Sequence, residues 1–208
     1  MTPEQRLQYT QVISKYVPPT TVTTVVSWVE HYRFKLKITR SRSTKLGDFM
    51  NGVGGTLHQI TVNHDLNAYS FFITLVHEVA HLATYDKYKH TVKPHGDEWK
   101  FSFKILMQQF LTTDVFPQDV LTELRRMMAN PAASSCTDVG LHRVLRSYDA
   151  KAQNTELTLL ENLLQGQQFQ FNNQQFLIQE IKRKRYLCLS LTTNKQYSFS
   201  PLAEVKMG

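Results

Sequence analysis

Cysteine is nearly absent from this chain of 208 residues, which contains only Cys136 and Cys188. The two lie far apart in the sequence, and neither belongs to a CxxC pair. A disulfide framework needs several cysteines, and a zinc site made of four thiolates needs closely spaced pairs. The sequence therefore excludes both kinds of scaffold, and we expect both cysteines to be reduced thiols.

Long apolar runs are also missing. No stretch approaches the roughly 20 apolar residues that a transmembrane helix requires. The first residues, MTPEQRLQYTQVISKYVPP, lack the apolar core that is typical of a signal peptide. We therefore expect a cytoplasmic protein without a membrane partner.

Acidic residues are scarce toward both ends of the chain. Residues 1–50 contain eight Lys or Arg against three Asp or Glu, and residues 150–208 contain seven against four. The segment between them is nearly balanced, although the whole chain has a formal net charge of +7. Such a distribution suits an acidic partner, with DNA, single-stranded or duplex, as the leading candidate. A basic surface can also serve solubility alone, so the charge leaves both interpretations open.

Two basic segments are candidate nucleic-acid contacts. One lies within residues 31–47, which include no acid, and the other is a run of four cations in the tail. Aromatic residues near the second run could stack on unpaired bases. The structural alternatives are a solvated strand face and a charged turn beside core aromatics. The candidate contacts are Arg40, Arg42, Lys182, Arg183, Lys184 and Arg185.

The spacing of apolar residues predicts an α+β protein. The strongest helical pattern covers residues 67–85, and alternating patterns predict strands at 34–39 and 57–63. A glycine-containing loop, residues 47–55, could make a hairpin-like connection between these strands. Further helices are expected at residues 3–17, 20–32, 97–111, 117–129 and 138–148.

Changes of composition along the chain predict its domain organisation. Residues 130–137, NPAASSCT, resemble a linker, and the tail beyond them contains short alternating runs. Asn172-Asn173 and Thr193-Asn194 separate these runs and favour tight hairpin turns. We expect a first domain at 1–130, a linker with short helices at 131–165, and a small basic antiparallel β module at 166–208.

The segment His77-Glu78-Val79-Ala80-His81 is the strongest chemical signal. Two histidines four residues apart on a helix project from one face and can bind the same zinc ion. The glutamate then lies beside the metal and can take a proton from the water that the metal polarises. This pattern predicts a hydrolytic metal site, with Glu78 as its general base.

A catalytic zinc ion usually has three protein ligands and an open position. His95 follows His81 by 14 residues, after a predicted loop and before the next helix. The chain could return to the metal at that point. The alternative is an ordinary solvated loop histidine.

Several segments resemble the SprT-like metallopeptidases, a group that includes proteases of DNA–protein crosslinks. They are TLVHEVAHL and PHGDEW, preceded by KITRSRSTKLGDF and ITVNHDLN, and the likeness covers roughly residues 30–111. The resemblance implies that His77, His81 and His95 bind zinc and that Glu78 is catalytic. It also implies a zincin-like minimal metalloprotease fold, with the active-site helix packed on a short sheet. Many bacterial relatives end in a cysteine-paired zinc ribbon, but this tail has Cys188 alone, so we expect one Zn²⁺ ion.

The leading hypothesis is a zinc metallopeptidase that hydrolyses proteins, including proteins bound or crosslinked to DNA, in a DNA-repair role. One alternative is a nucleic-acid-binding protein with a structural or vestigial metal site. Another is a metal-dependent hydrolase of non-peptide substrates, since activation of water does not define the bond that is cleaved. The residues leave the oxyanion-stabilising group unassigned.

Overall fold

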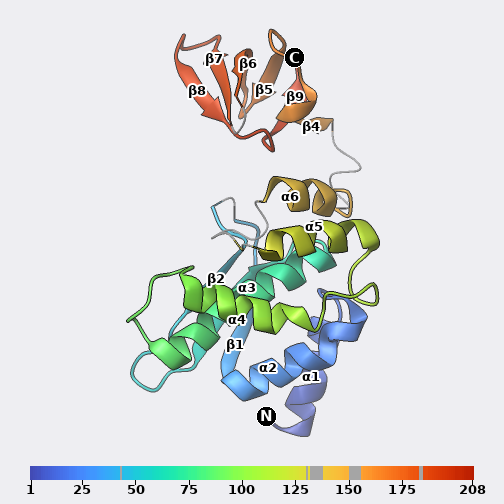
Figure 1. The fold of residues 1–208 in the computed structure, drawn as a ribbon, viewed down its shortest axis with the longest axis vertical. Helices are drawn as coiled ribbons and strands as arrows, with labels where there is room; N and C mark the ends of the chain where they lie inside the picture. Colours follow the sequence, from blue (N-terminus) through green and yellow to red (C-terminus); the bar gives the residue numbers. More distant parts are fainter. Residues whose placement is uncertain (43, 130, 132–137, 150–155, 183–184) are drawn as a thin grey trace. The chain divides into compact units, whose positions relative to one another are not determined.

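The computed structural model describes residues 1–42, 44–129, 131, 138–149, 156–182 and 185–208. They form a mixed α+β structure that divides into two compact units, Met1–Asp149 and Ala150–Gly208 (Figure 1). The first unit contains helices around a small sheet, and the second is a β module. This confirms the predicted α+β class.

Polar side chains begin several helices of the first unit, where the first N–H groups have no helical partner. Thr2 forms a capping box with Gln5, Asn67 accepts hydrogen bonds at the start of α3, and Asp138 caps α6. Within the described ranges, none of the helices combines the length and apolarity needed to cross a bilayer. The helices are α1 (Pro3–Ile13), η1 (Pro19–Thr21), α2 (Val22–Tyr32), α3 (Ala68–Tyr88), α4 (Asp97–Gln108), α5 (Gln118–Ala129) and α6 (Val139–Arg146).

The first unit contains a three-stranded sheet in the order β1-β3-β2. Its strands are β1 (Phe34–Thr39), β2 (Gly47–Met50) and β3 (His58–Asn63). β1 runs parallel to β3, and β2 runs antiparallel to β3. The expected hairpin-like connection between the two predicted strands is therefore wrong. Parallel strands cannot be joined by a tight turn, and the connecting segment instead supplies β2 at the sheet edge.

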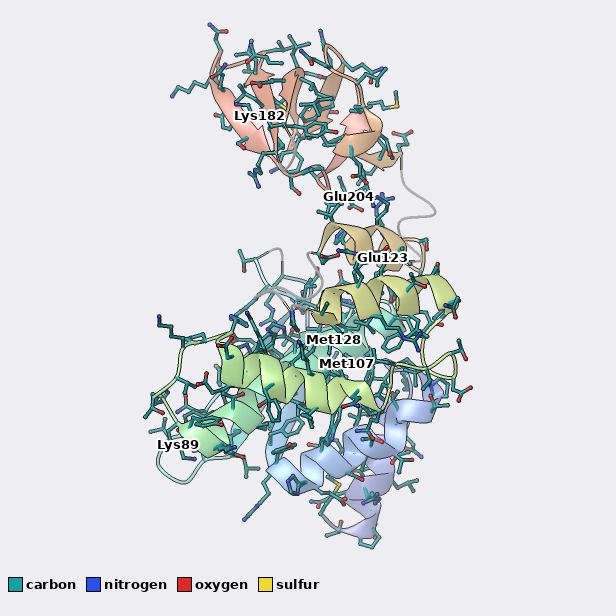
Figure 2. The ribbon with its side chains drawn as sticks, in the orientation of Figure 1. Lys89, Met107, Glu123, Met128, Lys182 and Glu204 are labelled. Carbon is teal, nitrogen blue, oxygen red and sulfur yellow. The ribbon has the colours of Figure 1, made fainter. Side chains whose placement is uncertain are left out.

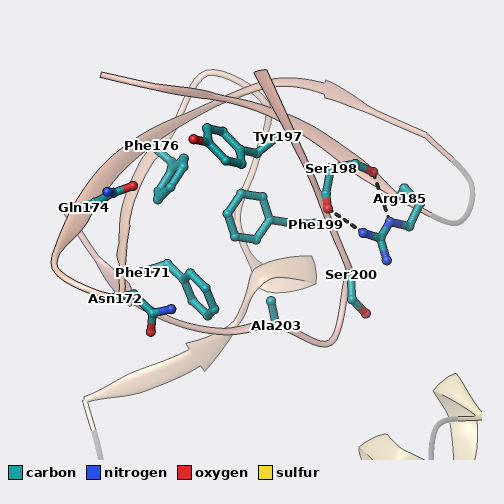
Figure 3. Close-up of a pocket in the computed structure, with 10 residues that line it drawn as sticks. All are labelled: Phe171, Asn172, Gln174, Phe176, Arg185, Tyr197, Ser198, Phe199, Ser200 and Ala203. Atoms are coloured by element: carbon teal, nitrogen blue, oxygen red, sulfur yellow. Dashed lines mark hydrogen bonds between the residues drawn. The ribbon is translucent and has the colours of Figure 1, made fainter. Parts of the chain in front are cut away.

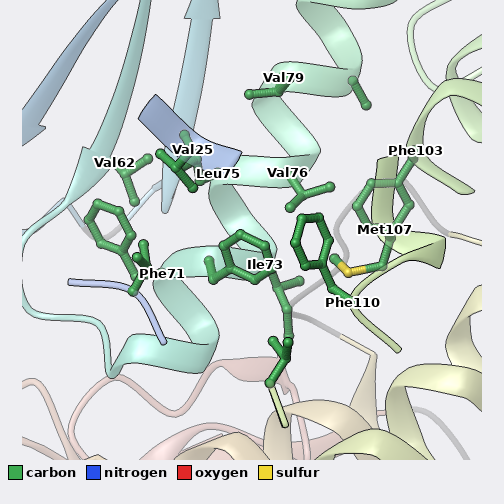
Figure 4. Close-up of a cluster of buried hydrophobic side chains, with 14 of the residues drawn as sticks. Val25, Val62, Phe71, Ile73, Leu75, Val76, Val79, Phe103, Met107 and Phe110 are labelled. Atoms are coloured by element: carbon green, nitrogen blue, oxygen red, sulfur yellow. The ribbon is translucent and has the colours of Figure 1, made fainter. Parts of the chain in front are cut away.

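Helix α3 is the central element of the first unit. It contacts β2 and β3 as well as α4, and Figure 4 shows Val62 of β3 on one side of it and Phe103 of α4 on the other. Met107 of α4 and Met128 of α5 are also buried (Figure 2). As a result, 13 of the 21 residues of α3 are buried, and they include polar groups that need partners.

Helix α6 belongs to the first unit and not to a linker. Leu141 and Leu145 are buried in the core of that unit, and Asn67 Nδ2 donates to the Leu145 carbonyl at 2.9 Å. Tyr148 donates a 2.8 Å hydrogen bond to Asp119 of α5. These contacts place the unit boundary after Asp149, about one helix later than the expected boundary after residue 130.

The second unit is a six-stranded antiparallel sheet in the order β4-β9-β5-β6-β7-β8. Asn172 and Asn173 have φ angles of 48° and 61°, so they form the tight β5–β6 turn that the sequence predicts. The elements are β4 (Leu157–Leu159), η4 (Leu160–Asn162), β5 (Gln168–Phe171), β6 (Gln174–Ile181), β7 (Tyr186–Ser190), β8 (Gln196–Phe199) and β9 (Glu204–Met207).

The β module has its own apolar core, separate from that of the first unit. Phe169, Phe176, Cys188 and Val205 are among its buried residues. Cys188 is a free thiol, and Cys136 lies outside the described residues. The module begins earlier than residue 166, since β4 lies in the expected linker and pairs with β9.

Candidate metal centre

Three histidines from two segments converge in the first unit. His77 and His81 lie one turn apart on α3, as their spacing predicts. His95 directly precedes Gly96, the N-cap of α4, and has a left-handed φ of 58°. That conformation is uncommon for a residue other than glycine. It occurs here in the turn before α4, where the chain comes back beside α3.

The three Nε2 atoms nearly form an equilateral triangle. The distance is 3.2 Å between His77 and His81, 2.9 Å between His81 and His95, and 3.1 Å between His95 and His77. Tetrahedral zinc with Zn–N bonds of about 2.1 Å would separate its nitrogen ligands by about 3.4 Å. The observed triangle is slightly tighter, and it fits a small cation with three imidazole ligands.

The protonation of these imidazoles also suits a metal. Burial, followed by repulsion from His81 and His95, lowers the pKa of His77 to about 3. Burial, followed by repulsion from His95, lowers the pKa of His81 to about 4, and burial lowers the pKa of His95. Neutral imidazoles keep a lone pair for a metal. Among the described residues, His77, His81 and His95 are the group of three or more His, Cys, Asp or Glu side chains whose ligand atoms lie close enough together to hold a metal ion.

Trp99 of α4 packs against all three histidines. Its ring centroid lies 4.6 Å from that of His77, 5.4 Å from that of His81 and 4.7 Å from that of His95. The side chain is buried and stacks on Phe103, and its Nε1 lies 3.4 Å from the His77 carbonyl oxygen, a long hydrogen bond. The sequence predicted a helix at residues 97–111, which includes Trp99, but the contact of Trp99 with the histidines depends on the tertiary structure.

Glu78 is buried beside the triad, against the edge strand β2. Burial, followed by the nearby Asp48 carboxylate, raises the pKa of Glu78 to about 8. The positive charges of Arg42 and Lys45 and a hydrogen bond from the Phe49 backbone N–H oppose this rise. The Phe49 N–H orients the carboxylate, and no sequence pattern could have identified it because backbone donors carry no side-chain signature.

The predicted nucleic-acid contacts occupy different surroundings. Arg40 is exposed, whereas Arg42 is partly buried and donates from Nε to Asn63 Oδ1 at 2.9 Å. In the β module, Lys182 pairs with Glu180 at 3.3 Å and Arg185 bonds to Ser198. Arg183 and Lys184 lie outside the described residues. Arg42 is therefore bonded within the first unit, and its positive charge acts on the Glu78 carboxyl group.

A comparison with protein-family models matches residues 9–121 to the SprT-like family. Searches of curated proteins and of solved structures return no match. The matched segment includes the three histidines and Glu78, together with the strands and helices that position them. It covers more than half of the 208 residues and extends beyond the segments that carried the resemblance. The chain therefore belongs to the SprT-like family, whose members are metallopeptidase-like proteins.

Proposed function

We propose that this protein is a zinc-dependent metallopeptidase with one zinc ion bound by His77, His81 and His95. The observation that carries the proposal is the convergence of three neutral imidazole nitrogens, each pair 2.9 to 3.2 Å apart. Three protein ligands leave one coordination position open, as hydrolytic zinc sites require. In this proposal, the arrangement of α3 on the short sheet is that of a zincin-like fold.

Zinc, when bound, supplies Lewis acidity toward water and the scissile carbonyl. Glu78 serves as general base: it takes a proton from the attacking water and delivers it to the departing amine. Burial raises the pKa of Glu78 to about 8, and a cation held by the histidines would lower that pKa, so that the carboxylate could accept the proton near neutral pH. The Phe49 N–H holds the carboxylate in place during both transfers.

The position of β2 supports a protein substrate. β2 lies at an edge of the sheet, so one side of its backbone has no strand neighbour in the described sheet. An extended peptide can pair with such an edge, and its backbone would then run past the Glu78 carboxylate. This observation favours a peptidase over a hydrolase of small non-peptide substrates.

We further propose that the substrates include proteins bound or crosslinked to DNA in the cytoplasm. The support is the surplus of positive charge toward both ends of the chain, together with the resemblance to crosslink proteases. The competing function is that of a nucleic-acid-binding protein with a structural or vestigial metal site. The two differ in whether Glu78 is needed for hydrolysis.

The Glu78→Gln variant tests the peptidase. We expect it to retain its zinc and its thermal stability. It should cleave an unfolded protein substrate at least about 100-fold more slowly, since a general base contributes about 10²–10⁴-fold to the rate. Asp97→Asn is the matched control, because Asp97 is fully exposed at the start of α4. Cleavage by Glu78→Gln at the rate of the parent protein would disprove the proposed mechanism.

A further inference from the structure

The β module has a cavity of about 540 Å³ that belongs to no site described above (Figure 3). Its lining comes from β5, β6, β8 and the segments beside them, all within the second unit. The volume lies within the range of about 300–1,000 Å³ that is typical of small-molecule sites. The cavity is large enough for one nucleotide or one amino-acid side chain with its backbone.

Aromatic rings form most of the apolar wall. Figure 3 shows Phe171, Phe176, Tyr197 and Phe199 gathered around the cavity. Phe199 is nearly perpendicular to Phe171, with centroids 5.3 Å apart, and Tyr197 is nearly perpendicular to Phe176 at 5.6 Å. Such edge-to-face contacts hold the rings in fixed orientations. Phe176 is only 3% exposed, whereas Tyr197 is 40% exposed, so Tyr197 offers a ring to a ligand and Phe176 supports it.

Arg185 provides a fixed positive charge at the same cavity. Its Nε donates to Ser198 Oγ at 3.0 Å, and its Nη2 donates to the Ser198 carbonyl oxygen. These bonds orient the guanidinium and use two of its five N–H donors, so the remaining donors can bind a ligand. A guanidinium held in this way loses little side-chain entropy when it binds a phosphate.

The charge at the cavity selects between ligand classes. Aromatic cavities bind methylated ammonium groups by cation–π attraction, but Arg185 would repel such a cation. No Asp or Glu is among the residues that line the cavity, so nothing in its lining favours a positive ligand. A flat, stackable ring attached to an anion matches both the aromatic wall and the guanidinium. Nucleotides have this combination of groups.

We propose that this cavity binds an unpaired base of a single-stranded nucleic acid, with the base against Tyr197 and Phe199 and its phosphate at Arg185. A strand is favoured over a free nucleotide because Arg185 ends a run of four consecutive cations that starts at Lys182. Successive phosphates of a strand can meet such a run, as in other single-strand-binding proteins. Asn172 and Gln174 at the rim supply amide groups for the base edge.

The test uses the full-length protein and a fluorescently labelled single strand of thymidines, titrated at several salt concentrations. Tyr197→Ala should weaken binding by about 5- to 100-fold, which is the effect of one lost base stack, and Tyr197→Phe should bind like the parent. Arg185→Gln should weaken binding and reduce the slope of log K against log salt by about 1. Lys206→Gln is the matched control, since Lys206 pairs with Glu156 and does not line the cavity.

Several results would overturn the proposal. The proposal is wrong if the protein does not bind the strand at low salt, or if Tyr197→Ala and Tyr197→Phe bind it equally well. It is also wrong if the protein binds a free nucleotide as tightly as the strand. Tight binding of a trimethyl-lysine peptide with none of the strand would show a methyl-ammonium site instead. Circular dichroism of each variant checks that the β module remains folded. The measurement needs neither zinc nor Glu78, so its outcome is independent of the proposed peptidase activity.

Discussion

Gly47 and Glu78 approach so closely that a Cβ atom at position 47 would lie 2.6 Å from the Glu78 Oε1 atom. The same Cβ would lie 2.7 Å from Thr74 Cγ2. Since real Cβ atoms do not make such contacts, any other residue at this position must displace the carboxylate or the strand. Because Gly47 of β2 has no side chain, the carboxylate of Glu78, the proposed general base, can occupy this space.

We expect Gly47→Ala to lower the cleavage rate by at least about tenfold, because misplacement of a reacting group by about 1 Å can cost about 100-fold. Overpacking should also destabilise the first unit by about 1–3 kcal/mol. Kinetic assays and denaturant unfolding measure the two effects. Adding Thr74→Ser removes the methyl contact and should restore part of the stability without the activity. Met50→Ala, at an exposed position of β2, serves as the control. Full activity of Gly47→Ala would contradict the assigned role of this contact.

Each single substitution, His77→Ala, His81→Ala or His95→Ala, should reduce the zinc content of the purified protein to a small fraction of one equivalent. Two imidazoles bind the metal far more weakly than three, and chelators should lower the melting temperature of the parent protein by removing a ligand of the folded state. His31→Ala should bind zinc normally, since His31 is an exposed residue of α2. Metal analysis and thermal melting measure these effects. Full zinc content in His95→Ala would exclude His95 as a ligand.

Trp99→Leu should weaken zinc binding by about 10-fold or more, because groups that support metal ligands typically contribute about 10- to 100-fold to affinity. It should also cost about 2–4 kcal/mol of stability. Trp28→Leu is a matched control: Trp28 is buried in the same core but packs on Phe72 and Phe110. We expect Trp28→Leu to lose about as much stability as Trp99→Leu but to bind zinc as tightly as the parent protein. Equal zinc affinities in the two variants would show that Trp99 supports the fold alone.

Cys188 should report the unfolding of the β module. Burial raises the pKa of its thiol to about 11 from an ordinary value of 9.0. The folded state therefore favours the protonated thiol. Its contribution to stability is fully present below pH 9 and is lost as the pH rises from about 9 to 11. In a Cys136→Ser background, thiol labelling in the native protein at pH 8 should be at least about 100-fold slower than in denaturant. Equally fast labelling in both states would contradict the burial of Cys188.

Features that depend on residues close together in the sequence could be predicted from the sequence alone. The apolar face of α3 and the spacing of His77 and His81 are local properties, and so is the Asn172-Asn173 turn. The position of His95 was predicted partly from the family resemblance. Its left-handed backbone could not have been foreseen because non-glycine residues seldom adopt it.

The missed elements depend on contacts between distant residues. β2, with four residues, and β4, with three, are too short to show an alternating pattern, and each is defined by pairing with another strand. The proximity of Arg42 to the Glu78 carboxylate likewise depends on the hydrogen bond from Arg42 to Asn63, 21 residues away. A charged residue in a basic segment resembles a surface residue until such a partner is known.

The burial of α3 on most sides has a consequence for the exchange of metal. The amides of its buried middle part, around His77 and Glu78, lie in the core of the first unit, so we expect them to exchange with deuterium only when that whole unit unfolds. The turn that contains His95 is partly exposed, so we expect it to open locally more readily than α3. Two of the proposed ligands thus stay fixed in the native state while the third can withdraw. Zinc would then enter and leave by breaking its bond to His95 first, and the opening of this one turn would limit the rate of metal loss.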